Sequence, residues 1–296
     1  DNTIEMVERA THKSMATNYG STVQTRDMAS HTNVYVSQWL QKVWYKEGVF
    51  INNVDYEADT PQVYVKTFCT GYCLYEPDSG FCPRIPYVRQ LLDVGKFWEE
   101  CARGDIYLPP RTRKWNKTYW RNRVKKVLVL VRSPMELVTS RFLVYARQNG
   151  AKRARLGLLP YCNMLDKLYK DVKEVKKMAN RRYMRDIMLD GEATGVPCWT
   201  EFFRIFYWYA NAWEIADGRE SMVKYYEDFI NNPIGTATDI LDYAGLTRLE
   251  GMEIRPIGDE VNMMFTDEEK EKISVFMQAL GRNENPMWPD YFARYF

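Results

Sequence analysis

The sequence predicts an α/β fold in which helices cover both faces of a central parallel sheet. Short β-prone segments alternate along the chain with segments of helical periodicity, which is the order of such a sheet. The clearest strand, residues 127–131, is apolar at every position, and this is typical of a strand buried on both faces. The chain has 296 residues, 46% of them hydrophobic, and we expect one domain over residues 1–296.

Strands and helices are expected to follow one another in order. The predicted strands are at residues 21–25, 62–67, 127–131 and 222–226. The predicted helices are at residues 34–45, 86–102, 133 onward, 151–185, 200–216, 233–244 and 266 to about 280. Three of these helices have clear end signals, since Pro134 suits a first helical position, Gly245 suits a helix end, and Thr266 with Glu269 forms a capping box.

The composition disfavours several classes of protein. The longest aliphatic run, 127–131, is far too short to cross a membrane, and no apolar leader opens the sequence. We therefore expect a cytoplasmic protein that does not contact a membrane. Two histidines make a multi-histidine metal site improbable, so no metal is expected. Cys69, Cys73 and Cys82 lack the spacing of a zinc site; we expect reduced thiols there, with a disulfide among them as the alternative.

Positive charge is concentrated in two segments, although the formal net charge is only +2. Residues 111–126 hold eight basic and no acidic residues, and residues 151–185 hold eleven basic and three acidic ones. Aromatic residues interleave with the basic ones in 111–126, as they do in proteins that bind single-stranded nucleic acid. A solvated amphipathic helix and a basic rim for an anionic ligand are the other interpretations, and we expect no nucleic-acid partner.

Arg132 marks the strongest candidate site. It follows the strand at 127–131 and precedes a helix, and ligands of open α/β sheets bind at the carboxyl ends of the strands. The free N–H groups at a helix N-terminus favour anions, and Ser140 lies two turns into this helix on roughly the same face. An arginine and a hydroxyl placed in this way suit a phosphate group. A surface ion pair of Arg132 is the alternative.

Four segments resemble the sulfotransferases that use 3′-phosphoadenosine 5′-phosphosulfate (PAPS). Arg132-x-Pro134 followed by Ser140 is similar to the 3′-phosphate-binding segment of that family. Residues 223–246 resemble its YED…LGL strand and helix, 255–266 its C-terminal RKG…FT loop, and 63–68 its KTH strand end. The segments occur in the order of the family over nearly the whole chain.

The resemblance implies a P-loop-like fold of three layers and transfer of a sulfuryl group from PAPS to a hydroxyl or amine of a small-molecule acceptor. The product would be adenosine 3′,5′-bisphosphate (PAP), and no metal is required. The candidate catalytic residues are Lys66, which the resemblance implies, and His31, a histidine in the loop that corresponds to the family's phosphosulfate loop. The implied PAPS-binding residues are Arg26, Ser30, Thr32, Asn33, Arg132, Ser140, Tyr226 and Arg255. The acceptor is not specified, and a homodimer is possible in this family.

The chain departs from the family at two chemically important positions. The loop at 25–34, where the family has PKSGTTW, lacks the lysine; Arg26 or His31 can supply the positive charge there, and the alternative is a plain surface turn. Phe68 stands where the family has its acceptor-activating histidine, and phenylalanine cannot take a proton. His31 can replace either function, or face solvent. A catalytically inactive nucleotide-binding or scaffold protein is therefore the alternative function.

Overall fold

The computed structural model describes the chain in several stretches. These are residues 16–17, 65–66, 95, 97, 125–148, 157–170, 194–248, 250–251, 254, 263–284 and 292–296. The chain divides into two compact units whose segments alternate along the sequence. The first contains residues 1–83, 95–128 and 219–258, and the second contains residues 84–94, 129–218 and 259–296. The expectation of one domain stays a prediction.

The described stretches contain four strands in two small sheets. β1 (Ala16–Thr17) pairs in parallel with β2 (Val65–Lys66), so that Thr17 lies opposite Lys66. β3 (Lys126–Val131) pairs with β4 (Glu220–Tyr225). Three of them, β2, β3 and β4, overlap the strands predicted at residues 62–67, 127–131 and 222–226. β1 was not predicted, and the strand expected at 21–25 lies outside the described residues.

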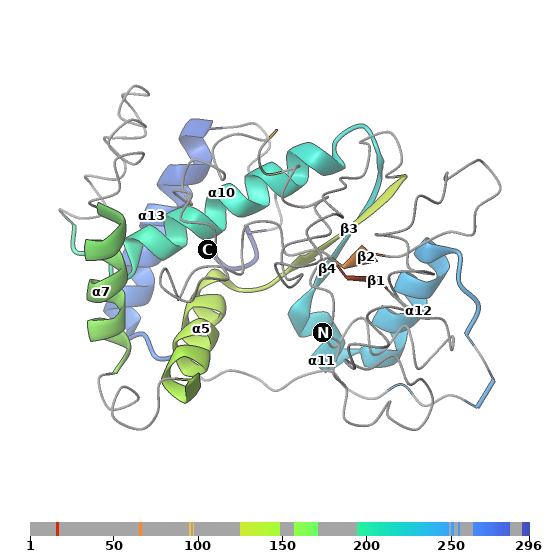
Figure 1. Cartoon of the computed structure of the whole chain (residues 1–296), viewed down its shortest axis with the longest axis horizontal. Coiled ribbons are helices and arrows are strands. Elements are labelled where there is room, and N and C mark those ends of the chain that lie inside the picture. The colour runs from red at the N-terminus through yellow and green to blue at the C-terminus, as the bar shows by residue number, and fades with distance from the viewer. Residues whose placement is uncertain are drawn as a thin grey trace, which may run out of the picture. The chain divides into compact units, whose positions relative to one another are not determined.

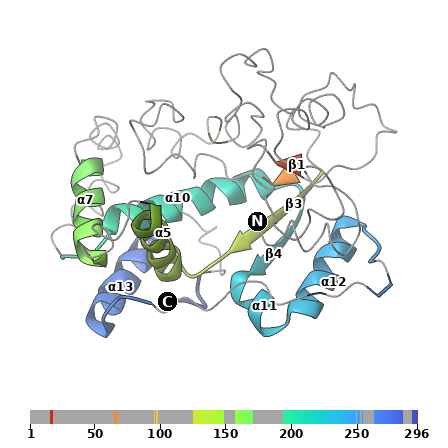
Figure 2. The same ribbon diagram turned by 60° about the horizontal axis from the view of Figure 1, so that its bottom comes forward.

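Tyr243 joins the starting ends of β3 and β4 through its phenol. The hydroxyl accepts a hydrogen bond from the Val127 amide (3.0 Å) and donates one to the Glu220 carbonyl (2.7 Å). Both strands therefore start beside the same side chain and run parallel, as their arrows do in Figure 2. Burial raises the pKa of Tyr243, which keeps the donating proton in place at neutral pH.

β3 is more exposed on one face than its sequence predicts. Val129 and Val131 are buried, but Leu130 between them is 39% exposed. Side chains alternate between the two faces of a strand, so the exposed position belongs to a different face from the buried ones. The expectation that residues 127–131 are buried on both faces is therefore wrong at Leu130. The apolar character of this residue does not indicate that it is exposed.

The first unit has a compact core under two short helices, α11 (Tyr226–Asn231) and α12 (Pro233–Ala244), which follow β4 (Figure 1). The helix predicted over 233–244 is confirmed with both of its ends. Gly245 adopts a left-handed conformation (φ 68°) at the end of α12, and the Leu246 amide donates to the Leu241 carbonyl at 2.8 Å. This is a Schellman ending, which glycine adopts without the steric penalty of a Cβ. The core comprises Phe229, Ala237, Ile240, Leu241, Ala244, Leu246 and Ile254, with Leu128 and Met222 of the strands packed against it.

The second unit is built around the aromatic helix α10 (Trp199–Ala216). The helices that contact it are α5 (Pro134–Gln148), α7 (Leu158–Lys170) and α13 (Asp267–Glu284), as Figure 2 shows. Aromatic rings line the contacts, with Phe202 5.9 Å from Phe265 and Tyr209 4.9 Å from Phe292 between ring centroids. α10 begins one residue before the predicted position, and α7 lies inside the helical segment expected over 151–185.

The predicted capping box at the start of α13 is present. The Thr266 amide donates to Glu269 Oε2 at 2.8 Å, and the Glu269 amide donates to Thr266 Oγ1 at 3.3 Å. These two bonds satisfy amide groups that the first turn of a helix leaves without partners. Ser and Thr at such positions stabilise helices by about 1 kcal/mol, so the signal in the sequence has a direct energetic cause.

A disulfide joins Cys162 of α7 to Cys198, the residue just before α10. Both cysteines are fully buried. Cys198 has a positive φ of 56°, which no other non-glycine residue in the described stretches shows. The sequence analysis did not anticipate this bond, because nothing in the spacing of the two cysteines indicates that α7 and the start of α10 come together. Cys69, Cys73 and Cys82 lie outside the described residues.

The described elements thus form a mixed α/β structure, as the alternation of strand-like and helical segments predicts. Among the helices that the structure describes, none combines the length and apolar character needed to cross a membrane. The predicted helices at 34–45 and 86–102 lie outside the described residues except at positions 95 and 97, both of which are helical.

Candidate functional site

The turn from β3 into α5 has the form that the sequence predicts. β3 ends at Val131, which is 1% exposed, and α5 begins at Pro134. The Leu137 amide donates to the Ser133 carbonyl at 2.9 Å, so Ser133 is the cap residue of the helix. Pro134 has no N–H, but the amides of Met135 and Glu136 have no acceptors within the helix, and this makes the turn suitable for an anion.

Arg132 forms an ion pair within this turn. Its Nε lies 3.0 Å from Glu136 Oε2, and the side chains of Arg132 and Glu136 are 14% and 17% exposed. The sequence left open a phosphate contact and an ion pair for Arg132, and the ion pair is present. An anion at this turn would have to share the guanidinium with a carboxylate, so Glu136 lowers the affinity of the turn for phosphate groups.

Ser140 lies on the same face of α5 as Ser133 and Glu136, from which it is separated by seven and four residues. Residues at these spacings lie above one another along a helix. Ser140 is half-buried, whereas its neighbours Val138 and Thr139 are buried. The structure therefore places a serine hydroxyl, a carboxylate and the helix start in one row, with Arg132 at its head.

Tyr226 does not end β4 as predicted but begins α11. The Asp228 carboxylate accepts a hydrogen bond from the Tyr225 amide at 3.3 Å, which caps the first turn of the short helix and ends the strand one residue early. Tyr226 is half-buried. Among the other predicted site residues, Lys66 lies in β2, and Arg26, Ser30, His31, Thr32, Asn33 and Arg255 lie outside the described residues.

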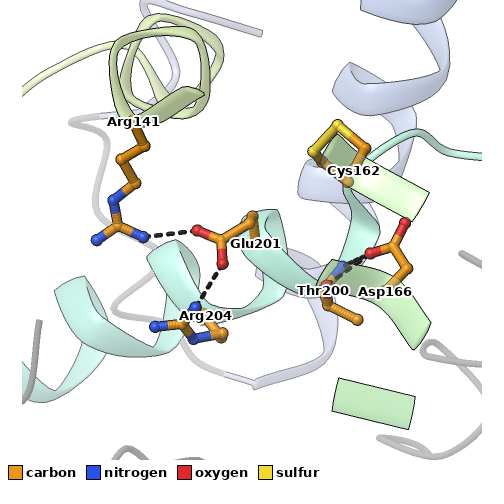
Figure 3. Close-up of polar contacts among 7 residues, drawn as sticks. Arg141, Cys162, Asp166, Thr200, Glu201 and Arg204 are labelled. Carbon is orange, nitrogen blue, oxygen red and sulfur yellow. Dashed lines mark hydrogen bonds and ion pairs between the residues drawn. A yellow bond between two sulfur atoms is a disulfide. The ribbon is translucent and has the colours of Figure 1, made fainter. Parts of the chain in front are cut away.

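A second polar cluster, which the sequence analysis missed, lies at the start of α10 (Figure 3). Glu201 is fully buried, and each of its carboxylate oxygens accepts from a guanidinium: Oε2 from Arg141 of α5 at 2.6 Å, and Oε1 from Arg204 one turn along α10. Burial by itself raises the pKa of Glu201, but the positive charges of Arg204 and Arg141 outweigh it and hold the pKa below its ordinary value. Glu201 is therefore ionised at neutral pH.

Asp166 of α7 caps the same helix from outside. Its Oδ1 accepts from the Thr200 amide at 3.1 Å and from Thr200 Oγ1 at 2.6 Å (Figure 3). Burial raises the pKa of Asp166 to about 6, although the bonds from Thr200 act in the opposite direction and the charge of Glu201 acts in the same direction. The disulfide leaves α7 at Cys162, one turn before Asp166, so a covalent bond and a polar cap hold α7 to the start of α10.

One signal for this cluster was present in the sequence. Glu201 and Arg204 are two charged residues, three positions apart, near the start of a helix that is rich in aromatic residues. Charged residues at buried positions are rare unless they are paired. The spacing predicts their mutual pair, but nothing local predicts Arg141, which is 60 residues from Glu201 in the chain.

Comparison with models of protein families, with curated proteins and with solved structures finds no match to this chain. The functional interpretation therefore depends on the residues themselves and on the described geometry.

Proposed function

We propose that the chain is a PAPS-dependent sulfotransferase, with the P-loop-like three-layer fold of that family. The observation that carries the proposal is the turn from β3 into α5. A buried strand ends at Val131, Arg132 follows, a helix begins at Pro134, and Ser140 lies two turns along on the face of the helix start. This arrangement suits a phosphate monoester, because an arginine, a hydroxyl and free helix amides all donate hydrogen bonds to it.

The residues present fit a phosphate monoester, although Glu136 competes with it for Arg132. Arg132 and the first turn of α5 supply positive charge and donors, and Ser140 supplies a hydroxyl. Glu136 supplies negative charge at the same place, at 3.0 Å from Arg132 Nε. Binding of a 3′-phosphate therefore requires Arg132 to exchange or share its carboxylate partner. Such an exchange is feasible for a guanidinium, which has five donors.

PAPS would supply the sulfuryl group and a bisphosphate leaving group. In-line transfer depends mainly on positioning and on charge stabilisation, which helix amides and cations provide. The resemblance implies that Lys66 and the segment from Arg26 to Asn33 would bind the sulfuryl end, and that Arg255 would bind the 3′-phosphate. His31 either takes the proton of the acceptor or supplies the missing positive charge. An amine or an acidic phenol would need no base.

Nucleotide discrimination tests the binding half of the proposal. PAP is expected to raise the melting temperature of the protein much more than adenosine 5′-monophosphate (AMP) does, because a ligand of the native state stabilises by mass action. Arg132→Ala is expected to weaken PAP binding by about 2–4 kcal/mol. Lys272→Ala, which removes one positive charge from the exposed side of α13, serves as the matched control and leaves PAP binding unchanged. Equal binding of PAP and AMP would refute the assignment of a 3′-phosphate site.

Turnover of labelled PAPS tests the catalytic half. A panel of phenols, amines and sugars should include an acceptor, and His31→Ala should lower its turnover at least about tenfold while PAP binding changes little. The second candidate is a nucleotide-binding protein without catalysis, which the presence of Phe68 in place of a histidine favours. PAP binding without turnover on any acceptor of the panel would favour this second candidate.

The buried disulfide bears on the location of the protein. Structural disulfides form in oxidising compartments and are rare in the cytosol. The Cys162–Cys198 bond therefore argues against the cytoplasmic location expected from the sequence. Alkylation of the protein in its native source without reductant, followed by mass spectrometry, tests this: unmodified and linked cysteines favour an oxidising compartment, and alkylated cysteines favour the cytosol.

A further inference from the structure

The carboxylate of Glu201 connects two helices of the second unit. One oxygen is bound to Arg204 of its own helix, and the other is bound to Arg141 of α5 at 2.6 Å (Figure 3). Glu201 is 0% exposed, Arg204 4% and Arg141 27%. Arg204 pairs with this carboxylate from within α10 itself. The bond to Arg141 is thus an additional contact, directed at α5.

Arg141 is the residue after Ser140, so its bond to Glu201 affects the position of Ser140. Neighbouring residues on a helix are separated by about 100° around the axis, so a contact at Arg141 fixes the direction in which Ser140 points. The same helix begins two residues after Arg132. The rotation of α5 about its axis therefore sets where the hydroxyl of Ser140 lies relative to Arg132, which precedes the helix.

Apolar packing also holds α5 against its neighbours, and the ion pair of Arg141 adds a directional contact to it. Phe142 of α5 packs on Tyr161 of α7 with 5.5 Å between ring centroids, and Val138 and Phe142 are buried. The hydrophobic effect is not directional, whereas a hydrogen-bonded ion pair is. Buried ion pairs contribute little net stability, because desolvation offsets the attraction between the charges. The pair of Glu201 and Arg141 is therefore better explained by the orientation that it imposes on α5 than by a gain in stability.

We infer that Glu201 is a positioning residue for the anion-binding turn: by holding Arg141 it fixes the rotation of α5 and so the place of Ser140 beside Arg132. This inference rests on the proposed function, since it assigns Glu201 to the 3′-phosphate site of that function. Glu201 does not touch the ligand. Its effect is expected on the part of the affinity that depends on the 3′-phosphate, and not on the rest of the nucleotide.

The experiment compares the affinities of PAP and AMP by titration calorimetry in the full chain. Removing Glu201 leaves two guanidinium groups without their carboxylate and can prevent folding, so the main variant is Arg141→Met, which leaves Glu201 paired with Arg204. We expect Arg141→Met to weaken PAP binding at least about tenfold and to leave AMP binding unchanged. Arg141→Lys keeps the charge and is expected to restore part of the difference. Leu143→Ala, at an exposed position two residues along α5, is the control and changes neither affinity.

The outcomes separate this inference from the proposed function. If wild type prefers PAP and Arg141→Met loses the preference, the positioning role is supported. If wild type prefers PAP and the variant retains the same ratio of affinities, even with a lower melting temperature, Glu201 and Arg141 are merely structural and the inference is overturned. If wild type does not distinguish PAP from AMP, the proposed function fails and the inference fails with it.

Hydrogen exchange provides a second, ligand-independent measurement. The amides of α5 near Ser140 should exchange faster in Arg141→Met than in wild type, because loss of the ion pair with Glu201 allows α5 to move. The exchange of the amides of α12 in the first unit should not change. Unchanged exchange in α5 would overturn the inference.

Discussion

Asp166 makes the stability of the protein depend on pH in a way that can be calculated from its surroundings. Burial raises the pKa of its carboxyl from 3.8 to about 6. Between these two values the folded state holds a proton that the unfolded state releases. The free energy of unfolding therefore falls as pH rises through this window, and the contribution of Asp166 no longer changes with pH below or above the window. The change is about 2 pH units multiplied by 1.36 kcal/mol, or about 3 kcal/mol.

The variant Asp166→Asn isolates this contribution. Asparagine Oδ1 can accept the same two hydrogen bonds from Thr200 but does not ionise. We therefore expect the stability of the variant relative to wild type to increase by about 2–3 kcal/mol between pH 4 and pH 7. Glu201 does not confound the comparison, because its two arginines hold its pKa below the ordinary value and it is ionised through most of the window.

Urea unfolding at pH 4, 5, 6 and 7 provides the measurement, with tryptophan fluorescence as the signal and without reductant. Glu268→Gln is the control, because the hydrogen bond from Lys272 lowers the pKa of this exposed carboxyl. Its contribution has the opposite sign: it is present above the ordinary pKa of glutamate and is lost as pH falls. A stability difference between Asp166→Asn and wild type that stays constant from pH 4 to pH 7 would refute the reasoning.

Three further changes test other parts of the structure. Replacing Cys162 and Cys198 by serine opens a loop of sequence separation 36 and should lower the free energy of unfolding by about 3–4 kcal/mol, measured in urea without reductant; no loss would show that the bond does not form. Gly245→Ala places a Cβ at φ 68° and should cost about 1 kcal/mol in the same assay, with an unchanged midpoint as the contrary result. Glu136→Gln removes the carboxylate that competes for Arg132 and should strengthen PAP binding about threefold in calorimetry; weaker binding would mean that Glu136 orients Arg132 for the ligand.

Local signals in the sequence predicted the elements whose cause is local. Pro134, the end of α12 at Gly245 and the Thr266 cap all act within one turn of helix, and the observed bounds follow them closely. The strand at 127–131 was predicted from its composition, but its exposed face at Leu130 was not, because exposure depends on what packs against the sheet. The register of strands and the distance between helices have no local cause.

The polar cluster at the start of α10 shows the same limit. Its members come from three helices, and their partners are 60 residues apart for Arg141 and Glu201 and 34 apart for Asp166 and Thr200. No short-range pattern encodes such pairs. The charged residues of α10 indicated only that some partner must exist, since an isolated buried charge is too costly to keep. The disulfide between Cys162 and Cys198 could not be predicted for the same reason, since its two cysteines are 36 positions apart in the chain.

Arg132 before α5 and Arg141 within it are paired with carboxylates that differ in exposure, and this difference determines which arginine a ligand can recruit. Arg132 is bound to Glu136, which lies in the first turn of α5 and keeps 17% of its side chain exposed. Water can therefore reach Glu136 when an anion displaces it from Arg132. Glu201 is fully buried, so withdrawing Arg141 would remove part of the compensation of a charge that water cannot reach. An anion at the start of α5 thus competes for Arg132 and leaves Arg141 in place. This is the division that binding requires: one cation exchanges its partner, while the other keeps the helix fixed during the exchange.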